Sequence, residues 1–412
     1  MKSLKRYNVT LTTIGPVHIG SGKSYSPKEF VVGDNLTWLE VPDTSRLVDY
    51  LMARGKLDRF EQFVAGRGRQ SDPQTLTEWL KAERIMFDEG QCGGYVLAIP
   101  DFTPAKERRD RNGRPGRSQT RINELRAFIK DAYGQPYIPG SSLKGVVRSL
   151  ILKSRMAMSP GQSAPDFRSR TPASKIENVY LRTLTADGKS GDDATFDVMR
   201  GIHISDSAPL TLDDLTVCQK IDAIPPKDGR QRYWGLPMFR ESLKPGTKVS
   251  FTVTVDEDLL EGQKFGVTTS RGVQAFDVGR VFEPYAAGAE LTYIQILSQI
   301  VYKEYVDSYL DIYDLTDQIL RIPEKEVDSN SFVYLGAGSG FFTKTIWDEL
   351  VPARQARMDR AQRQLERSFR QHHHENDVAV HGVSPRAVKL TKYDGRFYEM
   401  GKARITVEQE QR

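Results

Sequence analysis

Two basic residues at the start of a predicted helix form the clearest candidate anion site in this chain. Residues 137–152 read Tyr-Ile-Pro-Gly-Ser-Ser-Leu-Lys-Gly-Val-Val-Arg-Ser-Leu-Ile-Leu, which predicts a tight turn followed by a helix. Lys144 and Arg148 are four residues apart, so they share one helix face above unpaired N-terminal amides that favour an anion. The expected ligand is a phosphate, and the alternative is an ordinary capped helix with solvated side chains. The predicted phosphate-binding residues are Gly140, Ser141, Ser142, Lys144 and Arg148.

A glycine-rich turn near the N-terminus supplies a histidine. Residues 9–22 read as an alternating strand that ends in His-Ile-Gly-Ser-Gly. His18 is the first candidate for a general acid or base in metal-independent RNA cleavage. A single histidine in such a turn is more often a hydrogen-bonded structural residue, and no second histidine is placed by the sequence to complete a pair. We expect the turn to line an RNA path or a subunit interface through His18, Gly20, Gly22 and Lys23.

A second glycine-rich segment lies near the C-terminal end, at residues 335–345. It is not a Walker loop, because Thr343 stands where the second glycine belongs. It is not a dinucleotide fingerprint, because the sixth position from Gly336 is Phe341. A turn without side chains lets an RNA backbone approach closely, and the alternative is a structural turn that needs positive φ. The predicted RNA-contacting residues here are Gly336, Gly338, Gly340 and Lys344.

These three segments, taken in their order along the chain, resemble those of the RAMP proteins, the RNA-binding subunits of CRISPR effector complexes. Residues 201–207 and 241–247 are similar to later strands of the same family. The resemblance is strongest to the subunit that caps the type III-A (Csm) complex at the guide RNA 3′ end. It implies two ferredoxin-like, RRM-like modules. In this family the filament-forming subunits cleave target RNA with an Asp just after the first turn, but residues 20–27 contain no carboxylate, which argues against slicing by this chain.

The resemblance also implies a function and a set of partners. The function is a noncatalytic, guide-RNA-binding cap that is needed for crRNA maturation in antiviral defence, with no cofactor and no metal. The partners are the CRISPR guide RNA, the other subunits of a type III-A effector complex, above all the backbone RAMP subunit, and host nucleases that trim the 3′ end. Two alternatives stay open: a RAMP-type endoribonuclease that uses His18, and a protein scaffold without direct RNA contact.

Composition agrees with an intracellular, RNA-binding protein. The chain has 412 residues, a net charge of +5 and a mean hydropathy of −0.50, and no apolar run is long enough to span a bilayer. Cys92 and Cys218 are the only cysteines, so neither a disulfide framework nor a thiolate zinc site is expected. Residues 372–377, His-His-His-Glu-Asn-Asp, predict a solvated helix end, because consecutive histidines diverge. We therefore expect a cytoplasmic protein without membrane contact.

The positive charge is concentrated in one part of the chain. Residues 101–175 hold 16 Lys or Arg against 6 Asp or Glu. Within them, residues 106–121 carry seven basic side chains in a polar stretch interrupted by glycine and proline, which predicts a long basic loop. A charge run is usually only solvated surface, but this one leads towards the Lys144 helix and indicates electrostatic guidance of a polyanion.

The order of expected elements indicates an α+β fold. We predict an N-terminal RAMP/RRM-like domain over residues 1–185, with a helical lobe inserted at about 43–135, and a C-terminal one over 196–412. Polar, low-complexity stretches between them motivate the boundary. In the C-terminal half we expect strands at 198–205, 215–221, 238–242 and 248–255, helices at about 290–305 and 352–371, and a closing hairpin of 388–391 with 403–407.

Overall fold

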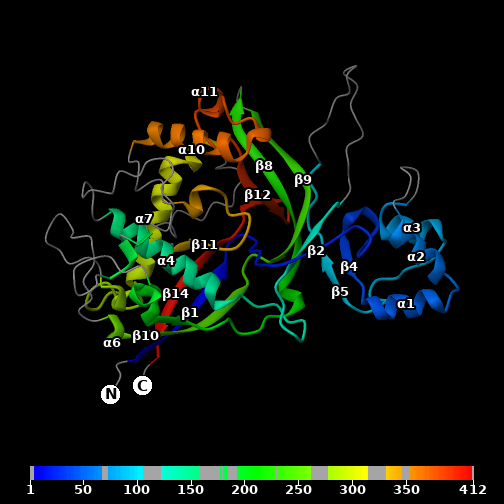
Figure 1. Cartoon of the computed structure of the whole chain (residues 1–412), viewed down its shortest axis with the longest axis horizontal. Coiled ribbons are helices and arrows are strands. Elements are labelled where there is room, and N and C mark those ends of the chain that lie inside the picture. Colours follow the sequence, from blue (N-terminus) through cyan, green and yellow to red (C-terminus); the bar gives the residue numbers. More distant parts are fainter. Residues whose placement is uncertain are drawn as a thin grey trace.

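The chain folds into three β-sheets with helices packed around them (Figure 1). The structure is a computed structural model, and it describes residues 4–66, 73–104, 122–157, 177–178, 180–183, 193–227, 230–260, 277–313, 331–345 and 353–410. The basic stretch 106–121 lies outside the described residues, as do most of the low-complexity stretches near the predicted boundary.

A five-stranded sheet joins the two ends of the chain. Its order is β11-β14-β1-β10-β7, and every neighbouring pair is antiparallel. Alternate residues of β1 are buried, with Tyr7, Val9 and Leu11 at most 1% exposed, as expected for a strand with one face on the core. The strands are β1 (Leu4–Thr13), β7 (Ile202–Ile204), β10 (Lys248–Asp256), β11 (Phe332–Tyr334) and β14 (Lys402–Gln409).

A six-stranded sheet lies beside the first and carries the predicted N-terminal turn. Its order is β13-β12-β8-β9-β6-β2, with one parallel pair, β6 with β9. The long β8–β9 hairpin is its centre. The strands are β2 (Gly20–Tyr25), β6 (Leu125–Phe128), β8 (Leu215–Lys227), β9 (Arg230–Leu243), β12 (Val388–Tyr393) and β13 (Arg396–Glu399).

The inserted lobe has its own small sheet and core, at the right of Figure 1. Its helix α1 begins after Asp43, whose side chain accepts a hydrogen bond from the Arg46 amide at 2.9 Å, a standard N-cap. Trp79 and Leu80 of α3 pack with Leu47 and Leu51 of α1. The elements are β3 (Val31–Val32), β4 (Trp38–Val41), β5 (Tyr95–Ala98), α1 (Thr44–Met52), α2 (Leu57–Ala65) and α3 (Leu76–Ala82).

Two long helices, α4 (Gly140–Ala157) and α7 (Tyr293–Ser308), cover the five-stranded sheet (Figure 1). The residues Leu143, Val147 and Ile151 of α4 recur every four positions and are fully buried in the main core. Each such side chain contributes roughly 2 kcal/mol by burial. This packing fixes which face of α4 meets the rest of the protein.

A second core joins the far end of α7 to the helices and strands near the C-terminus. Tyr305 and Tyr309 pack with Phe342, Met358 and Leu390. The remaining helices are α6 (Glu257–Leu260), α10 (Arg354–Ser368) and α11 (Asp377–His381). The short 3-10 turns are η1 (Asp34–Leu36), η2 (Ala194–Phe196), η3 (Val198–Gly201), η4 (Leu212–Asp214), η5 (Val278–Arg280), η6 (Leu310–Tyr313), η7 (Phe342–Lys344) and η8 (Arg370–His372).

The structure confirms a mixed α+β fold and corrects two details of the sequence prediction. The predicted hairpin of 388–391 with 403–407 is wrong: β12 pairs with β13, whereas β14 pairs with β1 and β11. The predicted strand at 198–205 begins as the 3-10 turn η3 and is extended only over β7. Both large sheets combine strands from either side of residues 185–196, so the predicted domain boundary does not separate sheets. The two-module division stays a prediction.

None of the described helices is long and apolar enough to cross a membrane.

Candidate RNA interface

The C-terminal glycine segment lies directly against the turn that contains His18. The Ala337 amide donates a hydrogen bond to the His18 carbonyl at 2.9 Å, and the Leu335 amide donates to the Gly401 carbonyl at 3.0 Å. Gly336 has a φ of 74°, and a Cβ built on it would lie 2.2 Å from the His18 carbonyl oxygen. Only glycine satisfies both conditions. We call residues 335–344 the glycine loop.

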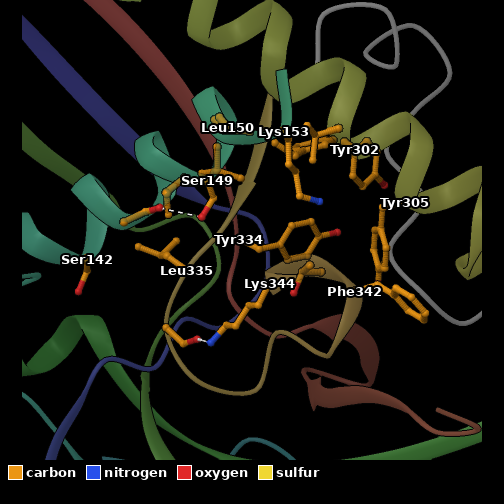
Figure 2. Close-up of a pocket in the computed structure, with 17 residues that line it drawn as sticks. Ser142, Ser149, Leu150, Lys153, Tyr302, Tyr305, Tyr334, Leu335, Phe342 and Lys344 are labelled. Atoms are coloured by element: carbon orange, nitrogen blue, oxygen red, sulfur yellow. Dashed lines mark hydrogen bonds between the residues drawn. The ribbon is translucent and has the colours of Figure 1, made fainter. Parts of the chain in front are cut away.

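Lys344 closes the glycine loop. Its ammonium group donates a hydrogen bond to the carbonyl of Gly336, at the other end of the loop (Figure 2). Partial burial lowers the pKa of Lys344, and the positive charge of Arg240 lowers it further. Phe342, beside it, is 2% exposed and packs on Tyr309 with ring centroids 4.6 Å apart, so it is a core residue. Lys344 therefore places an exposed positive charge beside a residue that is fixed in the core.

A cavity of about 280 Å³ opens between α4, α7 and the glycine loop (Figure 2). Hydroxyl groups and one ammonium group enter it from one face of α4, at Ser142, Ser149 and Lys153. Tyrosine rings line the opposite wall, and Lys344 stands at the rim. Aromatic faces beside basic side chains are what a single-stranded nucleic acid needs for base stacking and phosphate contact. The aromatic residues of the cavity are Tyr302, Tyr305, Phe332, Tyr334 and Phe342.

A buried ion pair beneath the cavity holds its tyrosines in place. Lys402 donates hydrogen bonds to the Glu399 carboxylate at 3.1 Å and to the Tyr302 hydroxyl at 2.6 Å. Tyr334 donates to the same carboxylate at 3.0 Å. Burial opposes the charge on Lys402, but the Glu399 carboxylate outweighs it and raises the Lys402 pKa. Burial and then Glu399 raise the pKa of Tyr334, so this ring stays neutral.

The predicted phosphate ligands at the start of α4 already include groups that bind acidic side chains of this chain. The Gly140 amide donates to the Asp206 carboxylate at 2.8 Å. The Arg148 guanidinium pairs with both oxygens of Asp197, at 2.8 and 2.7 Å, and with Glu177 at 3.1 Å. Arg148 therefore has a structural role in this conformation, in which acidic partners take the place expected for phosphate. Phosphate contact at the start of α4 stays a prediction.

Lys144 does not line the cavity, although it lies on the same helix. Partial burial lowers the pKa of Lys144, Asp197 opposes that effect, and Arg148 adds to it. The helix presents Ser142, Ser149 and Lys153 to the glycine loop, a face different from that of Lys144 and Arg148. These three polar side chains are spaced by seven and four residues, which places them on one helix face. That spacing could have been recognised in the sequence, but the sequence prediction considered only Lys144 and Arg148.

His18 is buried at the junction of β2 and β9. Its side chain is 2% exposed, and its Nδ1 lies 2.6 Å from the Glu241 carbonyl, which can only accept, so Nδ1 carries the proton. Burial lowers the pKa of His18 to about 4, and the positive charges of Arg240 and Arg126 contribute. A neutral, solvent-excluded imidazole lacks the access that general acid–base catalysis requires. The geometry therefore gives His18 a structural role.

The other predicted residues of the N-terminal turn lie on or beside the edge strand β2. A Cβ on Gly20 would lie 3.2 Å from the His18 imidazole, whereas Gly22 has a φ of 84° with open space around it. The Lys23 ammonium lies over the Tyr25 ring, 4.4 Å from its centroid.

In the glycine loop, the glycines at 338 and 340 both have a φ of 94°. RNA contact at these positions and in the N-terminal turn stays a prediction.

The histidine cluster at 372–374 is only partly solvated. His374 Nδ1 lies 2.7 Å from the Asp377 carboxylate, which is buried and also pairs with Arg386. Within the described ranges, no group of three or more His, Cys, Asp or Glu side chains could hold a metal ion.

Comparison with known proteins identifies the class to which this fold and site belong. The model of the RAMP superfamily matches residues 10–343, so the chain belongs to the RAMP superfamily. Two relatives, each described as "CRISPR system Cms protein Csm5", match over 98% of both chains: one from Mycobacterium tuberculosis is 30% identical, and one from Streptococcus thermophilus is 27% identical. With them, it is a RAMP protein of the type III-A Csm group.

A solved structure shows the same fold. The structure is described as "Cryo-EM structure of Csm-crRNA-target RNA ternary complex in type III-A CRISPR-Cas system", and one of its chains aligns with a TM-score of 0.64. The alignment covers 97% of this chain and 100% of that chain at 20% identity.

Proposed function

We propose that this chain is a noncatalytic guide-RNA-binding subunit of a type III-A effector complex, capping the filament of backbone subunits at the guide RNA 3′ end. Its proposed partners are the CRISPR RNA, the backbone RAMP subunit and the host nucleases that trim the guide. Its proposed location is the cytoplasm. By holding the 3′ portion of the guide, the subunit defines where trimming stops.

One observation carries the proposal: two segments selected from the sequence as RNA contacts, the helix α4 and the glycine loop, meet at one cavity. Ser142 of α4 and Gly336 and Lys344 of the loop line that cavity together. The partly exposed rings of Tyr302 and Tyr334 suit stacked bases, and the exposed ammonium group of Lys344 suits a phosphate beside them. The match to a chain of a Csm-crRNA-target RNA complex supports the same assignment.

Burial of His18 supports a noncatalytic subunit over an endoribonuclease. If the purified chain does cleave RNA, and if His18→Ala abolishes that cleavage while binding persists, the noncatalytic proposal fails.

The first test sequences the RNA that co-purifies with the complex assembled around this chain. In Lys144→Ala/Lys344→Ala we expect assembled complexes whose guides lose their defined mature 3′ ends, because the variant removes the proposed phosphate ligand on α4 and the proposed phosphate ligand at the rim of the cavity. The control is Lys81→Ala/Lys248→Ala, which removes the same charge from two exposed lysines outside the cavity. Guides unchanged in length and amount in the first variant would favour a scaffold without RNA contact.

A further inference from the structure

The guanidinium of Arg240 is buried in the six-stranded sheet, and no described residue supplies its counter-ion. The residue is 5% exposed, and its Nη2 contacts the sulfur of Met238, at 3.4 Å. Its Nε and Nη1 are buried and have no hydrogen-bond partner among the residues that the structure describes. A buried guanidinium in this state is strongly unfavourable, because its hydration is removed and not replaced. Such a group is stabilised when an anion completes it, and none of the described residues supplies that anion.

The residues around Arg240 increase the positive charge. Arg126 of β6 lies directly opposite it in the parallel pair, so both side chains leave the same face of the sheet. On the other side, the residue opposite Arg240 is Cys218, a buried and uncharged thiol. Burial lowers the pKa of Arg240, Arg126 lowers it further, and Glu124 opposes them. Glu124 forms an ion pair with Arg126 at 3.3 Å, and no ion pair joins Arg240 to a described residue.

The glycine loop brings a third cation to the same place. Glu241, the neighbour of Arg240 in β9, accepts a hydrogen bond from His18, and the His18 carbonyl in turn accepts one from Ala337 of the loop, so Arg240 lies near the loop. Burial lowers the pKa of Lys344, and the charge of Arg240 accordingly lowers it further. Arg126 is 43% exposed at its side chain and Lys344 is also exposed, so two of the three cations are open to an anion from solvent.

We infer that Arg240, with Arg126 and Lys344, binds a phosphodiester group of the RNA backbone. The assignment rests on the proposed function and adds a phosphate site that adjoins the tyrosine-lined cavity and shares Lys344 with it. A phosphate oxygen accepts hydrogen bonds from guanidinium N–H groups, and desolvation strengthens the pair. A carboxylate on a neighbouring subunit is also an anion, but three cations beside a glycine-rich loop fit a nucleic-acid backbone, which carries one negative charge per nucleotide.

The first experiment measures thermal unfolding of the full chain with and without inorganic pyrophosphate. The variant is Arg240→Met, which keeps the length and apolar stem of the side chain, and the charge-matched control is Arg6→Met, at an exposed position on β1. Without pyrophosphate, we expect Arg240→Met to unfold at or above the wild-type temperature, because an unpaired buried charge is gone. Pyrophosphate should raise the unfolding temperature of wild type and Arg6→Met by more than it raises that of Arg240→Met.

The second experiment measures RNA affinity of the assembled complex against salt concentration. For single-stranded RNA, the slope of log affinity against log salt becomes shallower by about 0.7 for each phosphate that the protein no longer neutralises. We expect that reduction in Arg240→Met and no change in Arg6→Met. A wild-type slope in Arg240→Met, together with an equal pyrophosphate response, overturns the inference while leaving the proposed function intact.

Two further outcomes separate the inference from the proposed function. If Arg240→Met holds RNA like the wild type but no longer assembles with its neighbours, the ligand is an acidic subunit surface and the RNA assignment is wrong. If the wild-type complex itself holds no RNA, the proposed function fails, and a pyrophosphate response that depends on Arg240 would then show the anion site alone.

Discussion

The carbonyl oxygen of His18 accepts a hydrogen bond from the amide of Ala337 at 2.9 Å, joining two turns more than three hundred positions apart in the chain. Gly336 makes this contact possible because it has no Cβ to collide with that carbonyl. The N-terminal turn and the glycine loop are thus one rigid unit, and each depends on the other for its shape.

A matched pair of glycine substitutions tests this dependence. Gly336→Ala and Gly340→Ala both place a Cβ at positive φ, which costs roughly 1–2 kcal/mol. Only Gly336→Ala also meets backbone, 2.2 Å from the His18 carbonyl, whereas Gly340 has open space. We expect Gly336→Ala to lower the free energy of unfolding by about 3 kcal/mol or more and Gly340→Ala by about 1 kcal/mol. Chemical denaturation measures both, and equal losses would contradict the rigid unit.

The burial of His18 predicts how stability depends on pH. Its pKa is about 4 in the folded chain and near 6.5 when exposed, so between these values the unfolded chain binds the extra proton. Stability from the neutral imidazole is present above about pH 6.5 and is lost as the pH falls towards 4, by about 3 kcal/mol in all. Chemical denaturation at several pH values between 4 and 6.5 measures the free energy of unfolding. Its dependence on pH should be weaker in His18→Asn than in the wild type and unchanged in His203→Asn, an exposed control on β7. A wild-type slope in His18→Asn would contradict the assignment.

The sequence was sufficient for the elements whose local signals are strong. The helix α4 begins at Gly140, after the Pro-Gly turn, because Leu143, Val147 and Ile151 recur at helical spacing and then pack on the sheet. The N-terminal turn that contains His18 and the glycine loop were also recognisable as glycine-rich turns, and their contact with RNA stays a prediction. Their contact with each other was not, because a hydrogen bond between residues 18 and 337 leaves no pattern in either segment.

The pairing of Arg148 separates the stability of α4 from any RNA contact nearby. Arg148→Met removes a side chain that is 27% exposed and leaves Asp197 and Glu177 without it. We expect a loss of about 2 kcal/mol in the free energy of unfolding, between the values for exposed and buried ion pairs. Lys144→Met breaks no ion pair between described residues and should cost less than about 0.5 kcal/mol. Urea denaturation distinguishes them, and a stable Arg148→Met would make that guanidinium available again as a phosphate ligand.

The ion pair beneath the cavity gives a double-mutant test. Lys402→Met leaves the Glu399 carboxylate buried without its ammonium partner, and we expect a loss of about 3–5 kcal/mol. Lys402→Met/Glu399→Gln removes both charges and should recover most of that loss, because Tyr334 can still donate to the amide oxygen. A full cycle of unfolding free energies measures the coupling. Additive losses would mean that the pair does not hold the tyrosine wall.

Two features could not be predicted because they depend on tertiary context. The strand β13 is four residues long and follows β12 after a two-residue turn. Because it is so short, the sequence prediction paired β12 with the longer β14. The actual partner of β14 that the prediction missed is β1, about four hundred residues earlier. Arg240 reads as an ordinary strand residue, and its burial follows only from the elements that cover the sheet. The signal that could have found it is the adjacent pair Arg240-Glu241 in the middle of a strand, where two charges rarely stand together.

The pairing of β1 with β14 also sets a constraint on synthesis. β1 lies at the centre of the five-stranded sheet, yet one of its two neighbours consists of residues 402–409, and the two ends of the described chain lie side by side (Figure 1). During translation the first strand therefore waits for nearly the whole chain to leave the ribosome before its sheet can close. Until then it presents an open hydrogen-bonding edge, which exposes nascent chains to non-native strand pairing.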